Sequence, residues 1–182
     1  MFTRNAMFMC KAVGAALFVL AAGQAMAAET PHLGTPVTPA DIAAWDMSIS
    51  PDGASLPPGK GTAVQGKEIY ALKCTGCHGA NGEGKPADRL AGGQGSLATD
   101  APVKTVGSYW PYATTLFDYV RRAMPLNEPQ SLTNDEVYAV SAYVLSLNGL
   151  IGAKDQLNAK TLPKIKMPNR DNFFIVYPGN LK

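Results

Sequence analysis

Cysteine, histidine, net charge and long apolar runs are all scarce in this chain. Its 182 residues include three Cys, two His, and 16 basic against 14 acidic side chains. A protein that binds nucleic acid strongly needs a net basic surface, so the near-neutral balance argues against that class. Only one apolar stretch is long enough to suggest an export or membrane segment, and it lies at the N-terminus.

The N-terminal segment has the order of a secretory signal peptide. Arg4 and Lys11 supply positive charge, residues 12–22 read AVGAALFVLAA, and the small-residue pattern AMA follows at 25–27. The apolar run is too short to span a membrane permanently, although an uncleaved anchor is the alternative. We therefore expect residues 1–27 to be removed on export, which leaves a mature chain without a membrane span.

Removal of this segment would leave a formally neutral chain with few metal ligands. Two of the 16 basic residues would leave with it, and the 14 acidic residues would all remain. Cys10 would leave too, so the remaining cysteines would be Cys74 and Cys77, beside His32 and His78. Any cysteine-based site of the mature chain must therefore involve Cys74 and Cys77.

Capping residues and apolar spacing indicate three main helices. Thr62 with Gln65, and Thr133 with Glu136, match the capping box, in which each side chain bonds the backbone N–H of the other residue. Pro125 ends the middle helix, because proline cannot continue an α-helix. The sequence therefore predicts helices over residues 63–74, within 109–124, and over 133–147, with a glycine-rich loop at 79–108.

These helices lie between two irregular segments. Residues 28–61 are rich in Pro, Gly, Ser and Thr, and residues 150–182 contain three further prolines. We expect a small helical domain at 62–149, flanked by an N-terminal and a C-terminal extension. Trp45 is expected to anchor the first extension on the domain. The FFIVY stretch at 173–177 is expected to form a short strand or an apolar strap.

The stretch CTGCH at residues 74–78 brings together two cysteines and a histidine, and three chemistries use such a group. A thioredoxin-like dithiol needs C-x-x-C beside a βαβ pattern, which this sequence lacks. A structural zinc site needs four ligands and would have to include His32, while the adjacent Cys77 and His78 are poor ligands for one ion. The third chemistry is covalent attachment of haem, for which C-x-x-C-H is the signature.

Haem attachment accounts for the spacing within CTGCH. One helical turn places the sulfurs of Cys74 and Cys77 where the two vinyl groups of a porphyrin can reach them. The imidazole of His78 then meets the iron from the proximal side, and an exported chain without spare cysteines agrees with this chemistry. We therefore predict one covalently bound haem c, held by Cys74 and Cys77, with His78 as an axial ligand of the iron.

A methionine is the expected sixth ligand of the iron, since cytochromes with covalently attached haem often use Met, which raises their reduction potential. The mature chain offers Met47, Met124 and Met167. Met124 ends a predicted helix, precedes a proline and lies 46 residues after His78, far enough for the chain to reach the other face of the haem. We favour Met124, with Met167 as the next candidate. The alternative is that Met124 only fills the core.

The order of these motifs resembles that of class I c-type cytochromes. GKEIYALKCTGCHGANGEG, RRAMP and SLTNDEVYAVSAYVLSLNG follow one another within residues 62–149. The resemblance implies an all-α fold in which the first and last helices cross near the haem, with close approach at Gly66 and Tyr143 packed against it. It also implies that a backbone carbonyl, commonly of a proline, accepts a hydrogen bond from Nδ1 of His78. Pro86 lies earlier than in the family pattern, which leaves this acceptor open.

The two extensions add a narrower resemblance. WDMSISPDGASLPPG, TVGSYWPYATTLFDYVRRAMP and NAKTLPKIKMPNRDNF are similar to segments of cytochromes of bacterial sulfur oxidation. These include the cytochrome partner of periplasmic molybdenum sulfite dehydrogenases and the cytochrome subunit of sulfur dehydrogenase, which often carries a second haem domain. The single CTGCH motif of this chain favours a small monohaem carrier.

This resemblance implies a periplasmic electron carrier without catalytic residues. It would accept single electrons from a molybdenum sulfite or sulfur dehydrogenase and pass them to a downstream cytochrome or oxidase. Two alternatives stay open: a tightly bound subunit of such a dehydrogenase, and a haem enzyme that acts directly on a sulfur substrate. Tyr109 and Trp110 are candidate contacts of a haem propionate, or else buried aromatic residues.

Overall fold

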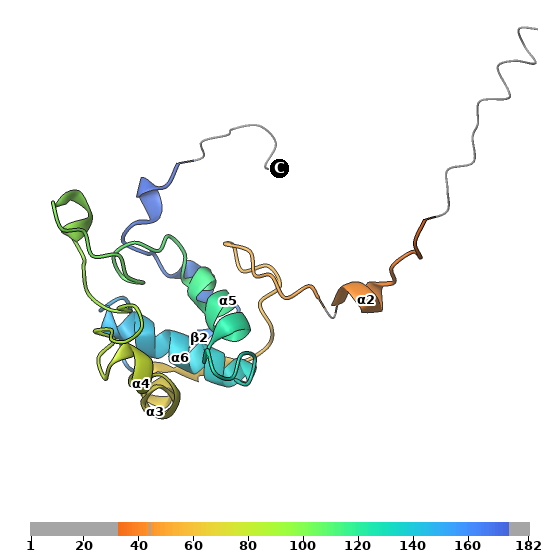
Figure 1. Ribbon diagram of the computed structural model, residues 1–182, viewed down its shortest axis with the longest axis horizontal. Helices are drawn as coiled ribbons and strands as arrows, with labels where there is room; N and C mark the ends of the chain where they lie inside the picture. Colours follow the sequence, from red (N-terminus) through yellow and green to blue (C-terminus); the bar gives the residue numbers. More distant parts are fainter. Residues whose placement is uncertain (1–32, 44, 175–182) are drawn as a thin grey trace, which may run out of the picture. The chain divides into compact units, whose positions relative to one another are not determined.

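The protein is described from a computed structural model, which defines residues 33–43 and 45–174 (Figure 1). The chain divides into two compact units, residues 1–39 and 40–182. In the first unit the described residues, 33–39, are exposed. The predicted signal peptide lies outside the described residues, as does the FFIVY stretch after Phe174. The second unit contains all the predicted helices.

Three main helices form the body of the second unit: α3 (Ala63–Lys73), α5 (Ala113–Ala123) and α6 (Asn134–Leu147). A single turn of helix, α4 (Thr75–His78), follows α3, and the short helix α2 (Pro39–Ala43) lies at the boundary between the units. Single 3-10 turns occur at 96–98, 162–164 and 170–172. This mostly helical arrangement confirms the predicted all-α class.

The start of two helices follows directly from their capping residues. At α3, the N–H of Thr62 donates to the Gln65 side chain at 2.9 Å, and Gln65 N–H donates to the Thr62 hydroxyl at 3.4 Å. At α6, the same reciprocal pair forms between Thr133 and Glu136, at 2.8 and 3.3 Å. Each box satisfies two N–H groups that have no partner within the helix. Both predicted capping boxes are therefore confirmed.

Helices α3 and α6 cross in close contact at Gly66. A Cβ atom at Gly66 would overlap the carbonyl oxygen of Ala139 and would lie 2.9 Å from Cβ of Tyr143. One turn further along α3, the ring of Tyr70 meets the edge of Tyr143, with centroids 5.0 Å apart. The helices can approach this closely because Gly66 has no side chain. The predicted roles of Gly66 and Tyr143 at the crossing are confirmed.

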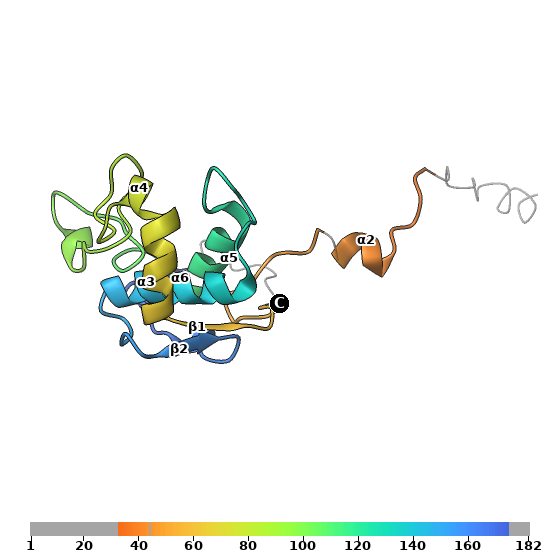
Figure 2. The same cartoon turned by 90° about the horizontal axis from the view of Figure 1, so that it is seen from below.

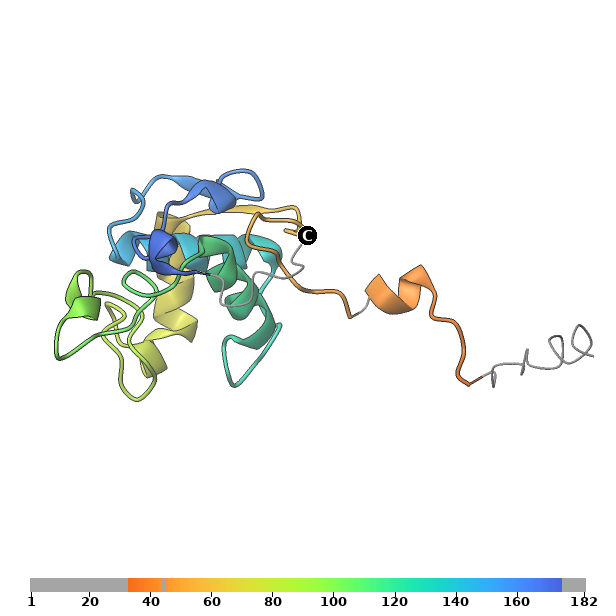
Figure 3. The same cartoon turned by 90° about the horizontal axis from the view of Figure 1, so that it is seen from above.

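A two-stranded sheet joins the two extensions. This sheet was not predicted from the sequence. Strand β1 (Lys60–Thr62) pairs antiparallel with β2 (Gln156–Asn158), with Gly61 opposite Leu157. Figure 3 shows these strands running along one side of α6. Leu157 is fully buried in the main core, as are Leu162 and Met167 further along the C-terminal extension. Burial of these side chains straps the extension to its own domain.

The N-terminal extension is held to the same body by side chains of α5 and α6. The Tyr138 hydroxyl donates to the carbonyl of Pro57 at 2.9 Å, and the Thr114 hydroxyl donates to that of Pro51 at 3.2 Å. The prediction for Trp45 is wrong, because its side chain is 87% exposed and does not anchor the extension. Within residues 33–43 and 45–174, no helix is long and apolar enough to cross a bilayer.

The capping box of α6 predicts a measurable dependence of stability on pH. Hydrogen bonds from the Thr133 backbone N–H and hydroxyl hold the pKa of Glu136 below its ordinary value of 4.5. A carboxyl with a lowered folded-state pKa stabilises the fold above its unfolded pKa, and this contribution is lost as the pH falls through the folded pKa. Glu136→Gln keeps the cap but cannot titrate. Urea unfolding at pH values from about 6 to 3 should therefore show a shallower loss of stability in Glu136→Gln than in wild type. Parallel pH curves would contradict this.

Candidate haem site

The CTGCH motif forms a separate turn of helix at the end of α3. Cys74 interrupts the helix with φ −120° and ψ −33°, and α4 continues from Thr75 to His78. The N–H groups of Cys77 and His78 both donate to the Cys74 carbonyl, at 3.2 and 3.0 Å. Cys74 is half-buried and Cys77 is exposed, and neither forms a disulfide. One turn thus brings the two thiols and the imidazole together, as the motif predicts.

The environment of Cys74 differs from that of a redox dithiol. Burial raises the pKa of its thiol to about 11, and the nearby Lys73 charge offsets this only in part. Reactive dithiols instead have a lowered cysteine pKa, which provides the thiolate at neutral pH. In addition, the strands of residues 33–43 and 45–174 pair antiparallel and form no βαβ unit. The thioredoxin-like alternative therefore has no support here.

The imidazole of His78 is oriented by a backbone carbonyl. Its Nδ1 lies 2.8 Å from the carbonyl oxygen of Asp88. A carbonyl can only accept a hydrogen bond, so Nδ1 carries the proton and Nε2 retains its lone pair for a metal. The acceptor left open by the sequence is thus Asp88 and not a proline. Sequence patterns gave no signal for it, because any residue type can supply a carbonyl.

A loop folds back over the motif and places this carbonyl. The N–H of Gly84 donates to the His78 carbonyl at 2.8 Å, and the N–H of Ala87 donates to the Cys77 carbonyl at 2.9 Å. On the other side of the motif, the Tyr70 hydroxyl donates to the Gly79 carbonyl at 3.0 Å. The backbone around His78 is therefore held from both sides.

The three candidate methionines have different surroundings. Met167 is 1% exposed and belongs to the main core. Met124 is half-buried, follows the last residue of α5 in extended conformation, and packs against the core. Met47 is half-buried in the N-terminal extension. Figure 2 shows α4 and the loop after α5 projecting from the same end of the domain. A thioether that is already enclosed in the protein core cannot also reach the haem iron. These surroundings therefore favour Met124 over Met167 as the iron ligand.

Tyr109 and Trp110 lie just before α5, where the C-terminal extension contacts one of them. The Asn169 side chain donates to the Tyr109 carbonyl at 2.8 Å, and the ring of Phe173 meets that of Tyr109 with centroids 5.5 Å apart. The half-buried ring of Trp110 contacts Tyr119, with centroids 6.0 Å apart. Tyr109 is exposed, so the alternative of two buried aromatic residues does not hold for it.

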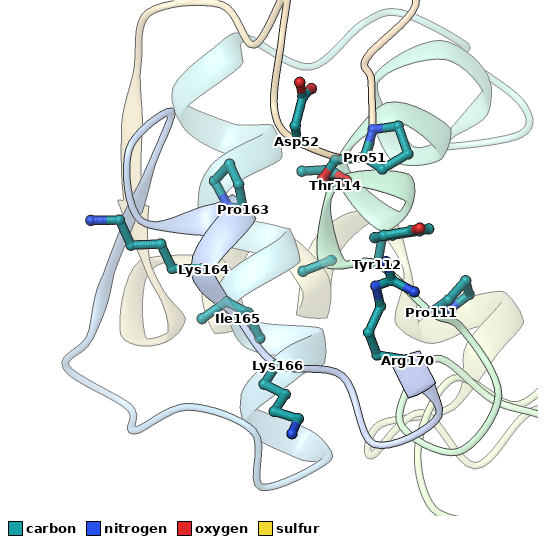
Figure 4. Close-up of a pocket in the computed structure, with 11 residues that line it drawn as sticks. Pro51, Asp52, Pro111, Tyr112, Thr114, Pro163, Lys164, Ile165, Lys166 and Arg170 are labelled. Carbon is teal, nitrogen blue, oxygen red and sulfur yellow. Dashed lines mark hydrogen bonds between the residues drawn. The ribbon is translucent and has the colours of Figure 1, made fainter. Parts of the chain in front are cut away.

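A cleft of about 400 Å³ lies apart from the motif (Figure 4). Its walls come from the N-terminal extension, the start of α5 and the C-terminal extension, and Arg170 stacks over the ring of Tyr112 at 4.4 Å. None of the predicted site residues lines it. The cleft is therefore not the place where the predicted chemistry occurs.

The residues of the motif suit covalent haem. Cys74 and Cys77 provide two unpaired thiols on one helical turn, and His78 provides an oriented nitrogen with a free lone pair. No cluster of three or more His, Cys, Asp or Glu residues occurs in residues 33–43 and 45–174 that could hold a metal ion directly. The zinc alternative also needs His32, which lies outside the described residues.

The chain belongs to the cytochrome c family, whose model matches residues 63–148. Its structure is similar to a chain in the crystal structure of the sulfane dehydrogenase SoxCD from Paracoccus pantotrophus, with 41% sequence identity and a TM-score of 0.75. The match covers 83% of this chain and 73% of that chain, so it extends beyond residues 63–148 into the extensions. The predicted class I c-type cytochrome and its covalent haem c are thereby confirmed, and the family's task is electron transfer rather than catalysis.

Proposed function

We propose that the protein is a periplasmic monohaem cytochrome that accepts single electrons from a sulfur-compound dehydrogenase and delivers them to a downstream cytochrome or oxidase. The similarity to a chain of a sulfane dehydrogenase structure carries this proposal, because it covers 83% of this chain and so extends beyond the cytochrome c domain at 63–148. The single CTGCH motif supports a carrier of one electron at a time. Oxidation of a sulfur compound by two electrons then requires two such transfers.

The site residues divide this task between attachment and ligation. Cys74 and Cys77 would hold haem c through two thioether bonds, and Nε2 of His78 and the thioether of Met124 would bind its iron. Haem c would supply an iron that gains and loses one electron at a time. The Asp88 carbonyl keeps the His78 ring in place through Nδ1. The polar tips of Tyr109 and Trp110 are proposed to donate hydrogen bonds to a haem propionate.

A tightly bound dehydrogenase subunit is the second candidate function. The C-terminal extension buries Leu157, Leu162 and Met167 in its own domain, which favours a separate carrier. The exposed Trp45, however, adds apolar surface that a permanent partner could cover. Gel filtration of the protein with its dehydrogenase would separate the two, since only a permanent subunit stays bound at nanomolar concentration.

Stopped-flow reduction of the purified ferric protein tests the proposed function. Sulfite alone is compared with sulfite plus a periplasmic molybdenum sulfite dehydrogenase. Fast reduction only with the dehydrogenase supports the carrier and places it in sulfite oxidation. Rapid reduction by sulfite alone would instead favour a haem enzyme. If neither reduces the protein, sulfite dehydrogenase is not the donor, and a dehydrogenase for sulfane sulfur is the next donor to mix with it.

Attachment through the two cysteines gives a separate prediction. Replacing both Cys74 and Cys77 by Ala should yield haem that acid acetone extracts, because no thioether bond remains. In wild type the pigment should stay with the precipitated protein. Single Cys74→Ala and Cys77→Ala variants should each keep one bond and retain their pigment. Pigment that stays attached in the double variant would contradict the proposed attachment.

A further inference from the structure

The side chain of Asn148 joins the end of α6 to the loop that follows the motif. Its Nδ2 donates to the carbonyls of Leu90 and Val144, at 3.1 and 2.9 Å. Its Oδ1 accepts from the N–H of Gly92 at 3.0 Å. Asn148 is 7% exposed, so these bonds form away from water. A buried carboxamide that uses both its donor and its acceptor holds the groups it bonds in one arrangement.

The surroundings of Asn148 leave it little freedom to move. A Cβ atom at Gly107 would overlap its side-chain oxygen, so the backbone at Gly107 packs directly on the carboxamide. The Gln94 side chain donates to the Asn148 carbonyl at 3.0 Å. The Thr105 hydroxyl donates to the Gly92 carbonyl at 2.6 Å, so both the N–H and the carbonyl of Gly92 are bonded. The segment from Leu90 to Gln94 is thereby tied to the rigid end of α6.

This segment lies next to the carbonyl that orients His78. Asp88 precedes Leu90 by two residues, and its side chain is exposed to solvent. Just before Asp88 in the chain, the Ala87 N–H donates to the Cys77 carbonyl at 2.9 Å. After Asp88, the bonds from Asn148 hold Leu90 and Gly92. The Asp88 carbonyl is thus placed by anchors before and after it.

We propose that Asn148 is a positioning residue for the axial histidine. By holding Leu90 and Gly92, it keeps the Asp88 carbonyl at hydrogen-bond distance from Nδ1 of His78. This bond makes the imidazole a more basic ligand, which favours the ferric state and lowers the reduction potential. Asn148 therefore contributes to the reduction potential through the Asp88 carbonyl and the His78 ring. The inference rests on the proposed role of His78 as an iron ligand.

The experiment compares Asn148→Ala and Asn148→Asp with wild type as holoproteins. Asn148→Ala removes the side-chain bonds to Leu90, Val144 and Gly92, whereas Asn148→Asp keeps an acceptor for Gly92 and loses the donor to Leu90 and Val144. In both variants the reduction potential should rise. The Nδ1 proton of His78, followed by NMR in the ferrous protein, should exchange with deuterium faster than in wild type. Gln94→Ala, at an exposed position, should shift both quantities in the same direction by a smaller amount.

Thr133→Ala is the matched control at the opposite end of the same helix. It removes the cap of α6 and should lower the thermal midpoint while the potential and the Nδ1 exchange rate stay at their wild-type values. If the variants that fold, Gln94→Ala included, show wild-type potential and exchange, the inference is overturned. If wild type itself lacks a haem-bound imidazole Nδ1 proton, the ligand assignment of His78 fails first, and the inference fails with it.

Discussion

Met124→Ala should lower the reduction potential and abolish the far-red absorption of the ferric protein. That band marks a bond between methionine sulfur and ferric iron. A thioether is a soft, neutral ligand that favours the ferrous state, whereas water or hydroxide would replace it in the variant and favour the ferric state. The expected fall is at least about 59 mV, which is a tenfold change in the equilibrium constant of a one-electron couple. Redox titration and a ferric absorption spectrum measure both quantities.

Met167→Ala is the matched comparison, because the two methionines differ in burial and not in chemistry. Met167 is 1% exposed within the core, so its truncation should leave a cavity and cost about 2–5 kcal/mol of unfolding free energy. The far-red band and the potential should stay close to those of wild type. If Met167→Ala loses the band and Met124→Ala keeps it, the proposed ligand is wrong. Loss of stability without loss of the far-red band in Met167→Ala would identify Met167 as a core residue and not an iron ligand.

The sequence predicts the parts of this fold that depend on local chemistry. Each capping box needs two side chains three residues apart, so Thr62 and Thr133 could be identified from the sequence alone. The CTGCH turn needs only five consecutive residues. The family resemblance then added the pairing of Gly66 with Tyr143, which lie on different helices and which no local pattern connects.

The features that the sequence did not predict depend on backbone groups or distant partners. Strands β1 and β2 have three residues each and lie nearly a hundred residues apart, too short for a period of two to be visible. The acceptor of the His78 hydrogen bond is a main-chain oxygen, so the identity of Asp88 carries no signal. The exposure of Trp45 has no signal in the sequence, because an aromatic residue in a Pro-rich segment is as compatible with exposure as with burial.

These differences have a common consequence for the site. The cysteine and histidine atoms proposed to bind haem come from five consecutive residues, which can be recognised in the sequence alone. The atoms that orient them come from the loop at residues 79–94 and from the end of α6. The first set of atoms determines which cofactor is bound, and the second set adjusts the reduction potential of its iron. Variants of the second set are therefore expected to keep the cofactor and change its potential.

Gly66→Ala should destabilise the fold strongly. The added Cβ would overlap the backbone carbonyl of Ala139, and it would lie 2.9 Å from Cβ of Tyr143. Neither group can rotate away, so α3 and α6 would have to separate along their contact. Overpacking of a core costs about 1–3 kcal/mol when side chains can adjust, and we expect a loss of at least about 3 kcal/mol here. Urea unfolding of the holoprotein measures this loss.

Gly76→Ala is the control, since a Cβ at Gly76 would meet no atom within 4 Å and this residue lies on the exposed face of α4. It should change the unfolding free energy by less than about 0.5 kcal/mol.

The comparison also tests whether the contact between α3 and α6 affects the haem site. Tyr70 lies one turn after Gly66, contacts Tyr143 and donates to the Gly79 carbonyl next to His78. Separation of the helices should therefore shift the ferric absorption spectrum in Gly66→Ala and not in Gly76→Ala. Equal stability of the two variants would show that α3 and α6 do not depend on the contact at Gly66.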